Sequence, residues 1–420
     1  MRVLLVNTHE RAGGAAVATR RLLEALNNNG VKAKMLVAKK ETDNINVVGL
    51  PHPWRHRMAF LWERLCIFLH LRFSKKHLFG LDIANSGVDI TSLPEFQQAD
   101  IIHLAWINQG MLSLKGIRNI LKSGKPVVWT MHDLWPVSGI CHLSLGCERF
   151  KSGCSHCPYL PKGGGERDLS YRVWQEKNRL YEAENISFVP CSRWLADEAR
   201  ASCLTRDHVV TTIPNPLNTS IFCKKDKALA RKSLHLPLDR RLIAFIAQKV
   251  TNENKGMNYL IEACDRLVSM YPKMKQSTGI VIIGGHAEEF EQQLAMPVYS
   301  LGYIRDEKKM AEVYRSIDVF VLPSLSENLP NTIMEAMACG VPCVGFNIGG
   351  IPEMIDHCKN GYVANYRDAG DLAKGIHWIL EETAYDELGR QAIHKVVSHY
   401  SQQAVAAKYI EVYNQATALK

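Results

Sequence analysis

The chain has 420 residues, which is too many for one ordinary hydrophobic core and predicts two or three domains. Hydrophobic residues make up 46% and charged residues 22%, which is typical of a globular protein and excludes a disordered chain. The formal net charge of +9 is spread along the chain, so it fits solubility, an anionic substrate or an anionic membrane surface. We expect no nucleic-acid partner.

The first residues, 1–7, form a short apolar run that stops at polar residues, which predicts a buried strand and not a secretory leader. No apolar stretch reaches the roughly 18 residues that a membrane-spanning helix needs. We therefore expect a cytoplasmic protein, and we expect most of its twelve cysteines to be reduced thiols.

The first half of the chain alternates short apolar runs with helical patterns. After the first strand, Gly13 and Gly14 precede a helix whose apolar residues recur on one face. Strands are expected at 3–6, 34–37, 101–104, 127–130 and 187–190. Strands that alternate with helices imply βαβ units and a parallel sheet.

The second half repeats this alternation, so the sequence predicts an α/β protein with two doubly wound, Rossmann-like domains at 1–212 and 217–400. Two prolines stiffen the link at 213–216. A last helix at about 402–420 is expected to pack back on the first domain. Strands are expected at 242–247, 279–283, 319–323 and 341–345, and helices at 257–270, 308–316 and 331–339, the last of these ended by Gly340.

The segment 54–73 interrupts this pattern because it mixes aromatic, leucine and basic residues. It is too short and too charged to span a bilayer. It fits a helix that lies on a membrane surface, and it equally fits a buried helix under an acceptor-binding loop.

The most informative stretch is 322–353, LPSLSENLPNTIMEAMACGVPCVGFNIGGIPE. Glu327 and Glu335 are separated by seven residues, and Gly340 and Pro342 follow in an Ala-x-Ala-x-Gly-x-Pro run. This stretch resembles the donor-site signature of retaining GT-B glycosyltransferases, in particular glycosyltransferase family 4. The resemblance implies two Rossmann-like domains that face each other across a cleft, and transfer of a hexose-type sugar from a nucleotide-diphosphate sugar with retention of configuration.

Physical chemistry supports a donor site in this stretch. A strand ends, a loop carries Glu327 and a helix begins near Asn331, so loop amides and the helix N-terminus suit a diphosphate. The resemblance places Glu335 at the ribose diol and Glu327 at the transferred sugar. The residues between them, Asn328, Leu329, Pro330 and Asn331, belong to the same donor site. The alternative is that both glutamates only stabilise the start of a helix.

Lysines are the expected cations for the diphosphate. Lys255-Gly256 matches the Lys-Gly of the family, whereas Lys249 stands near the position where the family commonly has an arginine. Lys249 fits a point charge for the phosphates and equally fits a solvated lysine at the end of a strand. No Asp-x-Asp sequence occurs, which agrees with catalysis that requires no metal cofactor.

The first domain supplies further candidates at the ends of its strands, where open α/β sheets bind ligands. Gly13 and Gly14 allow close approach of a ligand or form a generic turn. The resemblance brings His132 to the donor sugar, with Asp133 orienting it or binding the acceptor. The alternative for His132 is a histidine satisfied by local backbone. Acceptor candidates are His103, Trp106 and Asn108.

Four cysteines, Cys141, Cys147, Cys154 and Cys157, fall within seventeen residues. Their spacing suggests a structural, non-catalytic Zn²⁺ site that would hold a long loop rigid. A disulfide pair or free thiols remain alternatives.

The resemblance therefore implies a metal-independent, retaining hexosyltransferase that uses a UDP- or GDP-sugar. We expect a lipid-linked saccharide or polysaccharide acceptor in the synthesis of cell-surface polysaccharide such as capsule or lipopolysaccharide. Contact of 54–73 with the inner face of the plasma membrane is a further expectation. The alternatives are a GT-B enzyme with a small soluble acceptor and a non-catalytic nucleotide-sugar-binding subunit. A dehydrogenase is disfavoured because the Gly13-Gly14 turn lacks the G-x-G-x-x-G spacing.

Overall fold

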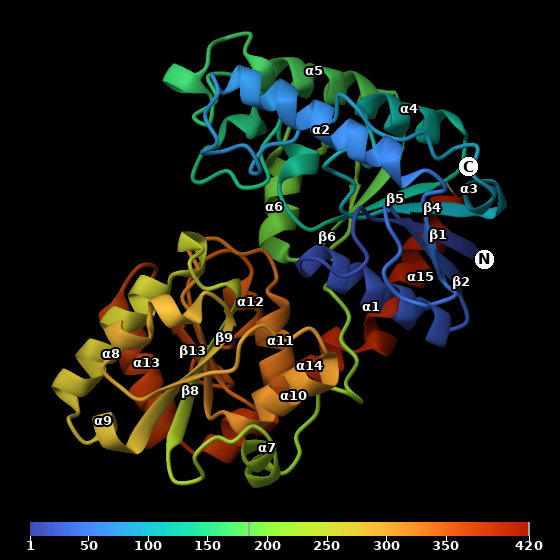
Figure 1. Cartoon of the computed structure of the whole chain (residues 1–420). Helices are drawn as coiled ribbons and strands as arrows, with labels where there is room; N and C mark the ends of the chain where they lie inside the picture. Colours follow the sequence, from blue (N-terminus) through green and yellow to red (C-terminus); the bar gives the residue numbers. More distant parts are fainter. Residues whose placement is uncertain (184, 419–420) are drawn as a thin grey trace. The chain divides into compact units, whose positions relative to one another are not determined.

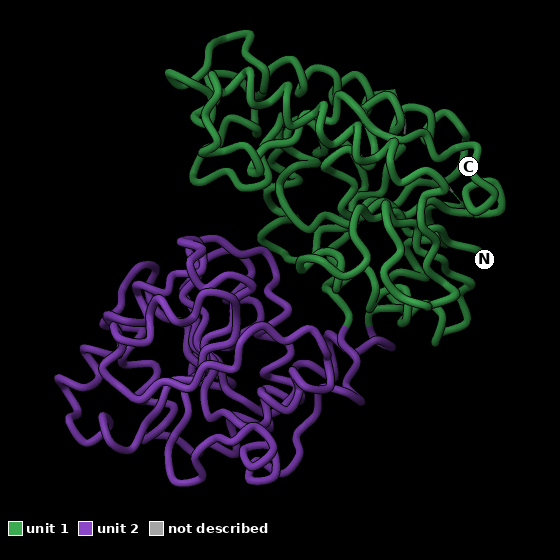
Figure 2. Tube along the Cα trace, viewed as in Figure 1, with its two compact units in different colours: residues 1–216, 405–420 green, residues 217–404 purple. Residues whose placement is uncertain are grey.

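The computed structural model describes residues 1–183 and 185–418, and the chain divides into two compact units (Figure 2). Unit 1 comprises Met1–Pro216 with Val405–Lys420, and unit 2 comprises Leu217–Ala404. The two segments that connect the units pair with each other through a bridge between Leu217 and Ser401. Residues 419 and 420, the end of the expected last helix, lie outside the described residues.

Unit 1 is built on a parallel sheet of seven strands in the order β3-β2-β1-β4-β5-β6-β7 (Figure 1). The strands are β1 (Arg2–Val6), β2 (Lys32–Val37), β3 (Val47–Gly49), β4 (Ile101–Leu104), β5 (Val127–Met131), β6 (Ile186–Pro190) and β7 (Val209–Val210). The helices are α1 (Gly14–Asn28), α2 (Pro53–His70), α3 (Pro94–Gln98), α4 (Leu114–Lys122), α5 (Leu169–Glu182), α6 (Arg193–Ala201) and α15 (Gln402–Ala418).

Alternate residues of each central strand enter two separate cores, because successive side chains of a strand point to opposite faces. In β1, Val3 and Leu5 pack in a cluster with α1 and α15, whereas Leu4 and Val6 pack in a cluster with α3 to α6. Helices therefore cover both faces of the sheet, as its nearly continuous apolar strands require.

Helix α15 returns to the first sheet after the chain has built unit 2. Val405, Tyr409 and Val412 lie in the same apolar cluster as Leu5 and Val128. Tyr409 and Tyr413 are at most 2% exposed, so this helix completes one face of the sheet.

Unit 2 contains a parallel sheet of six strands in the order β10-β9-β8-β11-β12-β13. The strands are β8 (Arg241–Lys249), β9 (Thr278–Gly285), β10 (Val298–Ser300), β11 (Val319–Leu322), β12 (Cys343–Phe346) and β13 (Gly361–Ala364). The helices are α7 (Lys227–Ser233), α8 (Met257–Met270), α9 (Met274–Ser277), α10 (Glu307–Ser316), α11 (Asn331–Ala338), α12 (Ile351–Met354), α13 (Ala369–His377) and α14 (Tyr385–Tyr400). Gly340 follows α11 with φ +78°, as the sequence predicted.

The strand orders locate a ligand-binding edge in each unit. In each sheet, successive strands are first added on one side of the first strand and then on its other side. This change of strand order lies between β1 and β4 in unit 1 and between β8 and β11 in unit 2. In open α/β sheets, ligands bind at such a switch point, outside the carboxyl ends of the strands. The predicted fold of two doubly wound parallel sheets is confirmed, and its two switch points lie where the candidate residues cluster.

Candidate functional site

In unit 2, the loops that follow β8 and β11 are tied together at the switch point. The backbone N–H of Leu325 donates to the carbonyl of Asn254 at 2.8 Å, and the Asn254 side-chain amide donates to the carbonyl of Ser326 at 2.9 Å. Asn254 lies in a single 3₁₀ turn, Glu253–Lys255, that leads into α8. The two loops therefore form one structured rim at the carboxyl edge of the sheet.

This rim brings Lys255 and Glu327 together. The Lys255 ammonium forms an ion pair with Oε1 of Glu327, with 28% and 13% of the two side chains exposed. The sequence assigned these residues to adjoining parts of one donor, the diphosphate and the sugar. Their contact gives the rim a fixed cation and a fixed carboxylate that remain within reach of solvent.

Two glycines fix the backbone around Glu327. Gly256 has φ +73°, and a Cβ there would lie 1.9 Å from the carbonyl oxygen of Pro323. Gly349 has φ +55°, and a Cβ there would lie 1.7 Å from the carbonyl oxygen of Glu327. Only glycine fits either position. Gly349 had no assigned role in the sequence, although its Gly-Gly pair was a visible signal.

Helix α11 starts directly after this loop. Its N-cap residue is Pro330, whose side chain cannot cap the helix. Glu335 lies one turn further on and is 7% exposed. The Tyr314 hydroxyl donates to its Oε2 at 2.8 Å, which orients the carboxylate.

Lys249 ends β8 at the same edge and is exposed. It lies in register with Gly285 of β9, and Gly284 approaches the Ala247 carbonyl so closely that a Cβ would lie 2.0 Å from it. The Gly284-Gly285-His286 turn is a candidate ligand contact that the sequence analysis missed. Two glycines directly after a strand were the signal for it.

In unit 1, the ends of β1 and β4 are locked together by polar contacts. Thr8 donates its backbone N–H to the Trp106 carbonyl at 2.8 Å and its hydroxyl to the Asn108 carbonyl at 2.8 Å. The His9 ring stacks on Trp106, with 6.0 Å between centroids. Gly13, with φ +90°, begins α1 nearby in sequence, and no atom lies within 4 Å of a Cβ built there. His9 is a further candidate that sequence reasoning missed.

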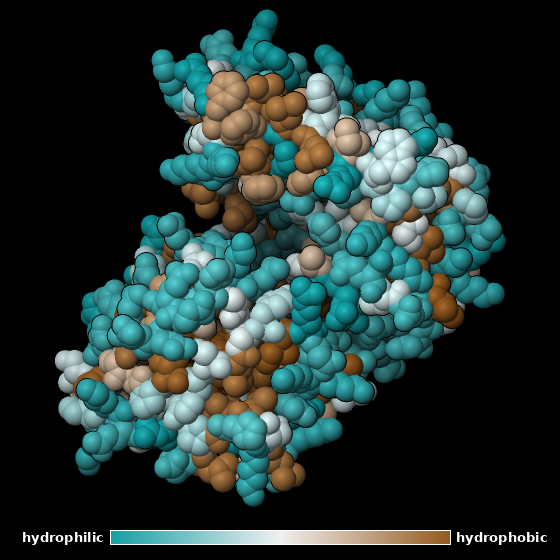
Figure 3. All heavy atoms as spheres, in the orientation of Figure 1, coloured by the Kyte–Doolittle hydropathy of each residue, from teal (hydrophilic) through white to brown (hydrophobic). Residues whose placement is uncertain are grey.

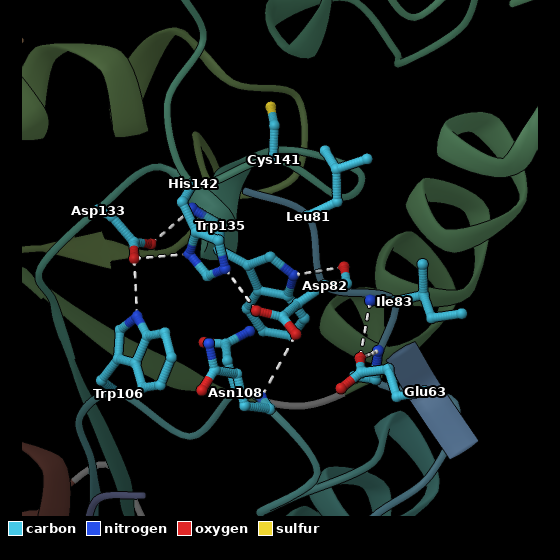
Figure 4. A network of polar contacts seen from close by, with 12 residues as sticks. Glu63, Leu81, Asp82, Ile83, Trp106, Asn108, Asp133, Trp135, Cys141 and His142 are labelled. Carbon is cyan, nitrogen blue, oxygen red and sulfur yellow. Dashed lines mark hydrogen bonds and ion pairs between the residues drawn. The ribbon is translucent and has the colours of Figure 1, made fainter. Parts of the chain in front are cut away.

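A network of polar contacts joins Trp106 to Asp133, His142 and Asp82 (Figure 4). The Trp106 indole donates to Asp133 Oδ2 at 2.9 Å, and His142 Nδ1 donates to the same oxygen at 2.7 Å. The other ring nitrogen, Nε2, contacts Asp82 Oδ2 at 2.5 Å. Two donors therefore orient Oδ2 of Asp133, and the Trp135 backbone N–H donates to its Oδ1 at 2.9 Å. Neither Asp82 nor the role of His142 was anticipated from the sequence.

Electrostatics keep this network charged at neutral pH. Burial disfavours the imidazolium of His142, but the carboxylates of Asp133 and Asp82 outweigh it and raise the pKa of His142 to about 10. Burial acts to raise the pKa of Asp133, but the His142 charge and hydrogen bonds from His142, Trp135 and Trp106 hold it below its usual value. Asp133 is thus a fixed anion that holds the Trp106 indole and is poorly suited to accept a proton.

His132 has the opposite character. Burial lowers the pKa of His132 to about 4, with Asp133 acting weakly against the shift. A neutral imidazole offers one N–H donor and one acceptor, which suits sugar hydroxyls. Its Nδ1 lies 3.5 Å from the Cys191 thiol sulfur, and Cys191 donates to Asn215.

The structure corrects the expectation for His103. Its side chain is fully buried, with Nδ1 2.6 Å from the Tyr413 hydroxyl and Nε2 2.7 Å from the Thr130 hydroxyl. Burial lowers the pKa of His103 to about 3, so the ring is neutral. Because both nitrogens are used inside the core beneath α15, His103 holds α15 and is not an acceptor contact. Asn108, 4% exposed, and Trp106 remain at the strand edge.

The four cysteines lie close together and line one cavity of about 20 Å³. All are free thiols, so the disulfide alternative is not realised. Burial raises the pKa of Cys141 and of Cys154 to about 12, which favours the protonated thiols. Among the described residues, no group of three or more His, Cys, Asp or Glu is arranged to hold a metal ion, so the arrangement gives the predicted zinc site no support.

The imidazolium of His142 makes a testable contribution to stability. Its folded pKa, about 10, lies above the unfolded value near 6.5, so its contribution is complete below about pH 6.5 and is lost as the pH rises through 10. Buried Lys177, whose pKa burial lowers to about 7, has the opposite dependence. We therefore expect the difference in unfolding free energy between the wild type and His142→Asn to shrink from pH 7 to pH 10. A constant difference in urea titrations would contradict the charged His142.

Two family models match the chain. The one described as Glycosyltransferase Family 4 matches residues 12–221, half of the chain, and the one described as Glycosyl transferases group 1 matches residues 240–382. The chain belongs to glycosyltransferase family 4. The region matched by the first model covers most of unit 1, and the region matched by the second contains the rim with Lys255 and Glu327.

Several relatives of this chain are named as glycosyltransferases. This chain is 26% identical over 265 residues to the uncharacterized glycosyltransferase MJ1607 of Methanocaldococcus jannaschii, and the match covers 61% of this chain and 67% of that one. It is 23% identical to the putative colanic acid biosynthesis glycosyl transferase WcaC of Escherichia coli, with 84% and 85% covered. It is 25% identical to a D-inositol 3-phosphate glycosyltransferase of Catenulispora acidiphila over 49% of this chain, and it spans about half the length of that relative.

Solved structures resemble this chain over nearly its whole length. A sucrose-phosphate synthase from Thermosynechococcus elongatus matches with a TM-score of 0.67 and 18% identity, covering all of both chains. HepE from Anabaena, solved in complex with UDP-glucose, matches with a TM-score of 0.65 and 16% identity, covering 99% and 100%. At these identities the likeness establishes the shared fold.

Proposed function

We propose that this family 4 glycosyltransferase transfers a hexose-type sugar from a UDP- or GDP-sugar to a lipid-linked saccharide or polysaccharide, with retention of configuration. The observation that carries the proposal is the Lys255–Glu327 pair on the rim at the β8/β11 switch point, beside the start of α11. A diphosphate requires cations and amide donors, and a sugar requires a carboxylate that accepts from its hydroxyls. The ion pair supplies the cation and the carboxylate, and the start of α11 supplies the amides.

In the proposed reaction, the bond between the sugar C1 and the diphosphate oxygen breaks and a bond from C1 to the acceptor oxygen forms on the same face. Lys255, Lys249 and the amides at the start of α11 stabilise the departing diphosphate. An oxygen of that diphosphate takes the proton of the attacking hydroxyl. Glu327 positions sugar hydroxyls, and Glu335 positions the ribose diol. This scheme uses no covalent enzyme nucleophile and no metal cofactor.

The acceptor class is proposed from relatives and from chemistry. WcaC is named for the biosynthesis of colanic acid, which supports a polysaccharide or lipid-linked acceptor for this chain. A small soluble acceptor is the second candidate, favoured by the match to a D-inositol 3-phosphate glycosyltransferase. Labelled donor incubated with and without a lipid extract separates the two, because only the first candidate requires the extract for labelled product.

Donor binding gives the first direct test. Because a ligand that binds only the folded state stabilises it by mass action, UDP or GDP at about 100 times its Kd should add roughly 2.7 kcal/mol of stability. We expect one nucleotide to raise the melting temperature of the wild type, with or without EDTA. Lys255→Gln should reduce the shift strongly, whereas the exposed lysine variant Lys273→Gln should keep it. No shift with any nucleoside diphosphate or its sugars would favour abandoning the donor site.

A further inference from the structure

Helix α2 presents an apolar face to solvent. Trp54, Met58, Leu61, Leu65 and Leu69 recur at helical spacing, and each is between 47% and 61% exposed. Trp62 lies on the same face, and Phe73 and Phe79 extend it beyond the helix. Apolar side chains gather over α2 in Figure 3, which has the orientation of Figure 1. Contiguous exposed apolar surface of this kind marks an interaction site.

The inner face of α2 buries two charged residues beside the apolar Ala59 and Ile67, which is unusual for a surface helix. The buried carboxylate of Glu63 accepts from the backbone N–H groups of Ile83 at 2.9 Å and Ala84 at 2.7 Å. Arg64 forms a buried ion pair with Asp82 and donates to the carbonyl of Leu81 at 3.0 Å. Specific polar bonds, together with the packing of Ile67 in an apolar cluster, therefore fix the rotation of the helix and leave its larger apolar face outward.

The exposed charge of the segment that carries this face has one sign. From residue 53 to residue 80, the only acidic residue is Glu63, which is buried. Five basic residues of the same stretch are exposed: Arg55, Arg57, Arg72, Lys75 and Lys76. Aromatic and leucine side chains flanked by exposed cations match the interface of an anionic bilayer, where apolar groups enter the headgroup region and cations meet lipid phosphates.

A second copy of the chain fits this face less well. A symmetric dimer would place the same surface on both sides of the contact, so five cations would face five cations. A bilayer with anionic lipids offers the opposite charge. Among the described residues, no helix is long and apolar enough to cross a membrane, which leaves contact with its surface.

We propose that α2, together with residues 71–79, docks this protein on the surface of an anionic lipid bilayer, with the helix axis in the plane of the interface. The proposal does not depend on the sugar or nucleotide that the enzyme uses. Docking would hold unit 1 at the surface from which a lipid-linked acceptor is presented.

The test uses the full chain and sedimentation with vesicles of phosphatidylcholine alone or with phosphatidylglycerol. We expect binding to the anionic vesicles, weakening with salt, and little binding to the neutral ones. Trp62→Gln with Leu65→Gln should abolish binding. The matched control, Leu229→Gln with Val397→Gln, removes two exposed apolar side chains of unit 2 and should bind as the wild type does. Lys75→Gln with Lys76→Gln should lower the partition coefficient roughly five-fold per charge.

Folding and donor binding are checked on the same variants by the melting temperature with and without nucleotide. A Trp62/Leu65 variant that melts normally and binds vesicles like the wild type would overturn the proposal. So would equal binding to neutral and anionic vesicles, or self-association that depends on Trp62 and Leu65 and competes with vesicles. A wild type that binds vesicles but no nucleotide would leave docking intact and remove the proposed transfer reaction.

Discussion

Glu327→Ala is expected to lower turnover roughly 10²–10³-fold, the range seen when one group that stabilises a transition state is removed. Folding should suffer much less. Lys255 is 28% exposed, so it can turn to solvent when its partner is lost, and a cost of about 1 kcal/mol is expected. Release of nucleoside diphosphate gives the rate, and urea unfolding gives the stability.

The control for this variant is Glu253→Gln, which removes an exposed carboxylate from the loop that carries Lys255. We expect its rate to match the wild type. Glu335→Ala should act differently, by raising the KM for the donor, because its carboxylate is assigned to ribose binding. Unchanged kinetics in both Glu327→Ala and Glu335→Ala would remove the donor site from this rim.

Asp82→Asn is expected to destabilise unit 1 by roughly 3–5 kcal/mol. Asp82 is fully buried and is the shared partner of Arg64 from α2 and of the His142 imidazolium. The amide would leave two buried cations with one fewer carboxylate, which is more costly than losing a solvated ion pair. Seven of the eight tryptophans belong to unit 1, so tryptophan fluorescence in urea reports mainly on this unit.

Asp100→Asn is the matched control, because Asp100 pairs with Arg2 at 3.1 Å with both side chains largely exposed. Its loss should cost less than about 1 kcal/mol. Asp82→Asn should also raise the accessibility of the Trp106 indole through the loosened His142 and Asp133. Equal stability of the two variants would show that the buried network does not hold α2 to the sheet.

The sequence predicted the central strands and the loop that carries Glu327, because both depend on local patterns, but it missed the short strands β3, β7, β10 and β13. Buried strands such as 127–130 are recognised as short apolar runs, and the helical patterns between them predict that the strands are parallel. The rim at Glu327 was predictable because a strand, a loop acid and a helix start are consecutive in the chain. The ion pair between Lys255 and Glu327 was not predicted, although both residues lie in loops at one edge of the sheet.

Residues that meet only in space were beyond the reach of these patterns. His103 lies near the end of a strand, as ligand-binding residues do, but α15, some three hundred positions later, covers it. One ring nitrogen contacts Tyr413 of α15 and the other contacts Thr130. Asp82 and His142 come from segments without regular structure, so no periodicity joined them. In α2, the charged Glu63 and Arg64 face inward, and no pattern in the sequence predicted which face of this helix is buried.

By itself, the sequence determined the alternation of strands and helices, the two domains and the motif around Glu327 and Glu335, because hydrophobic period and short motifs are local. The tertiary structure alone decided which polar side chains are buried, which face of α2 is exposed and which charges are paired. The physical reason is that burial and ionisation depend on neighbours distant in the chain, and a buried charge is stable only where the fold supplies its partner.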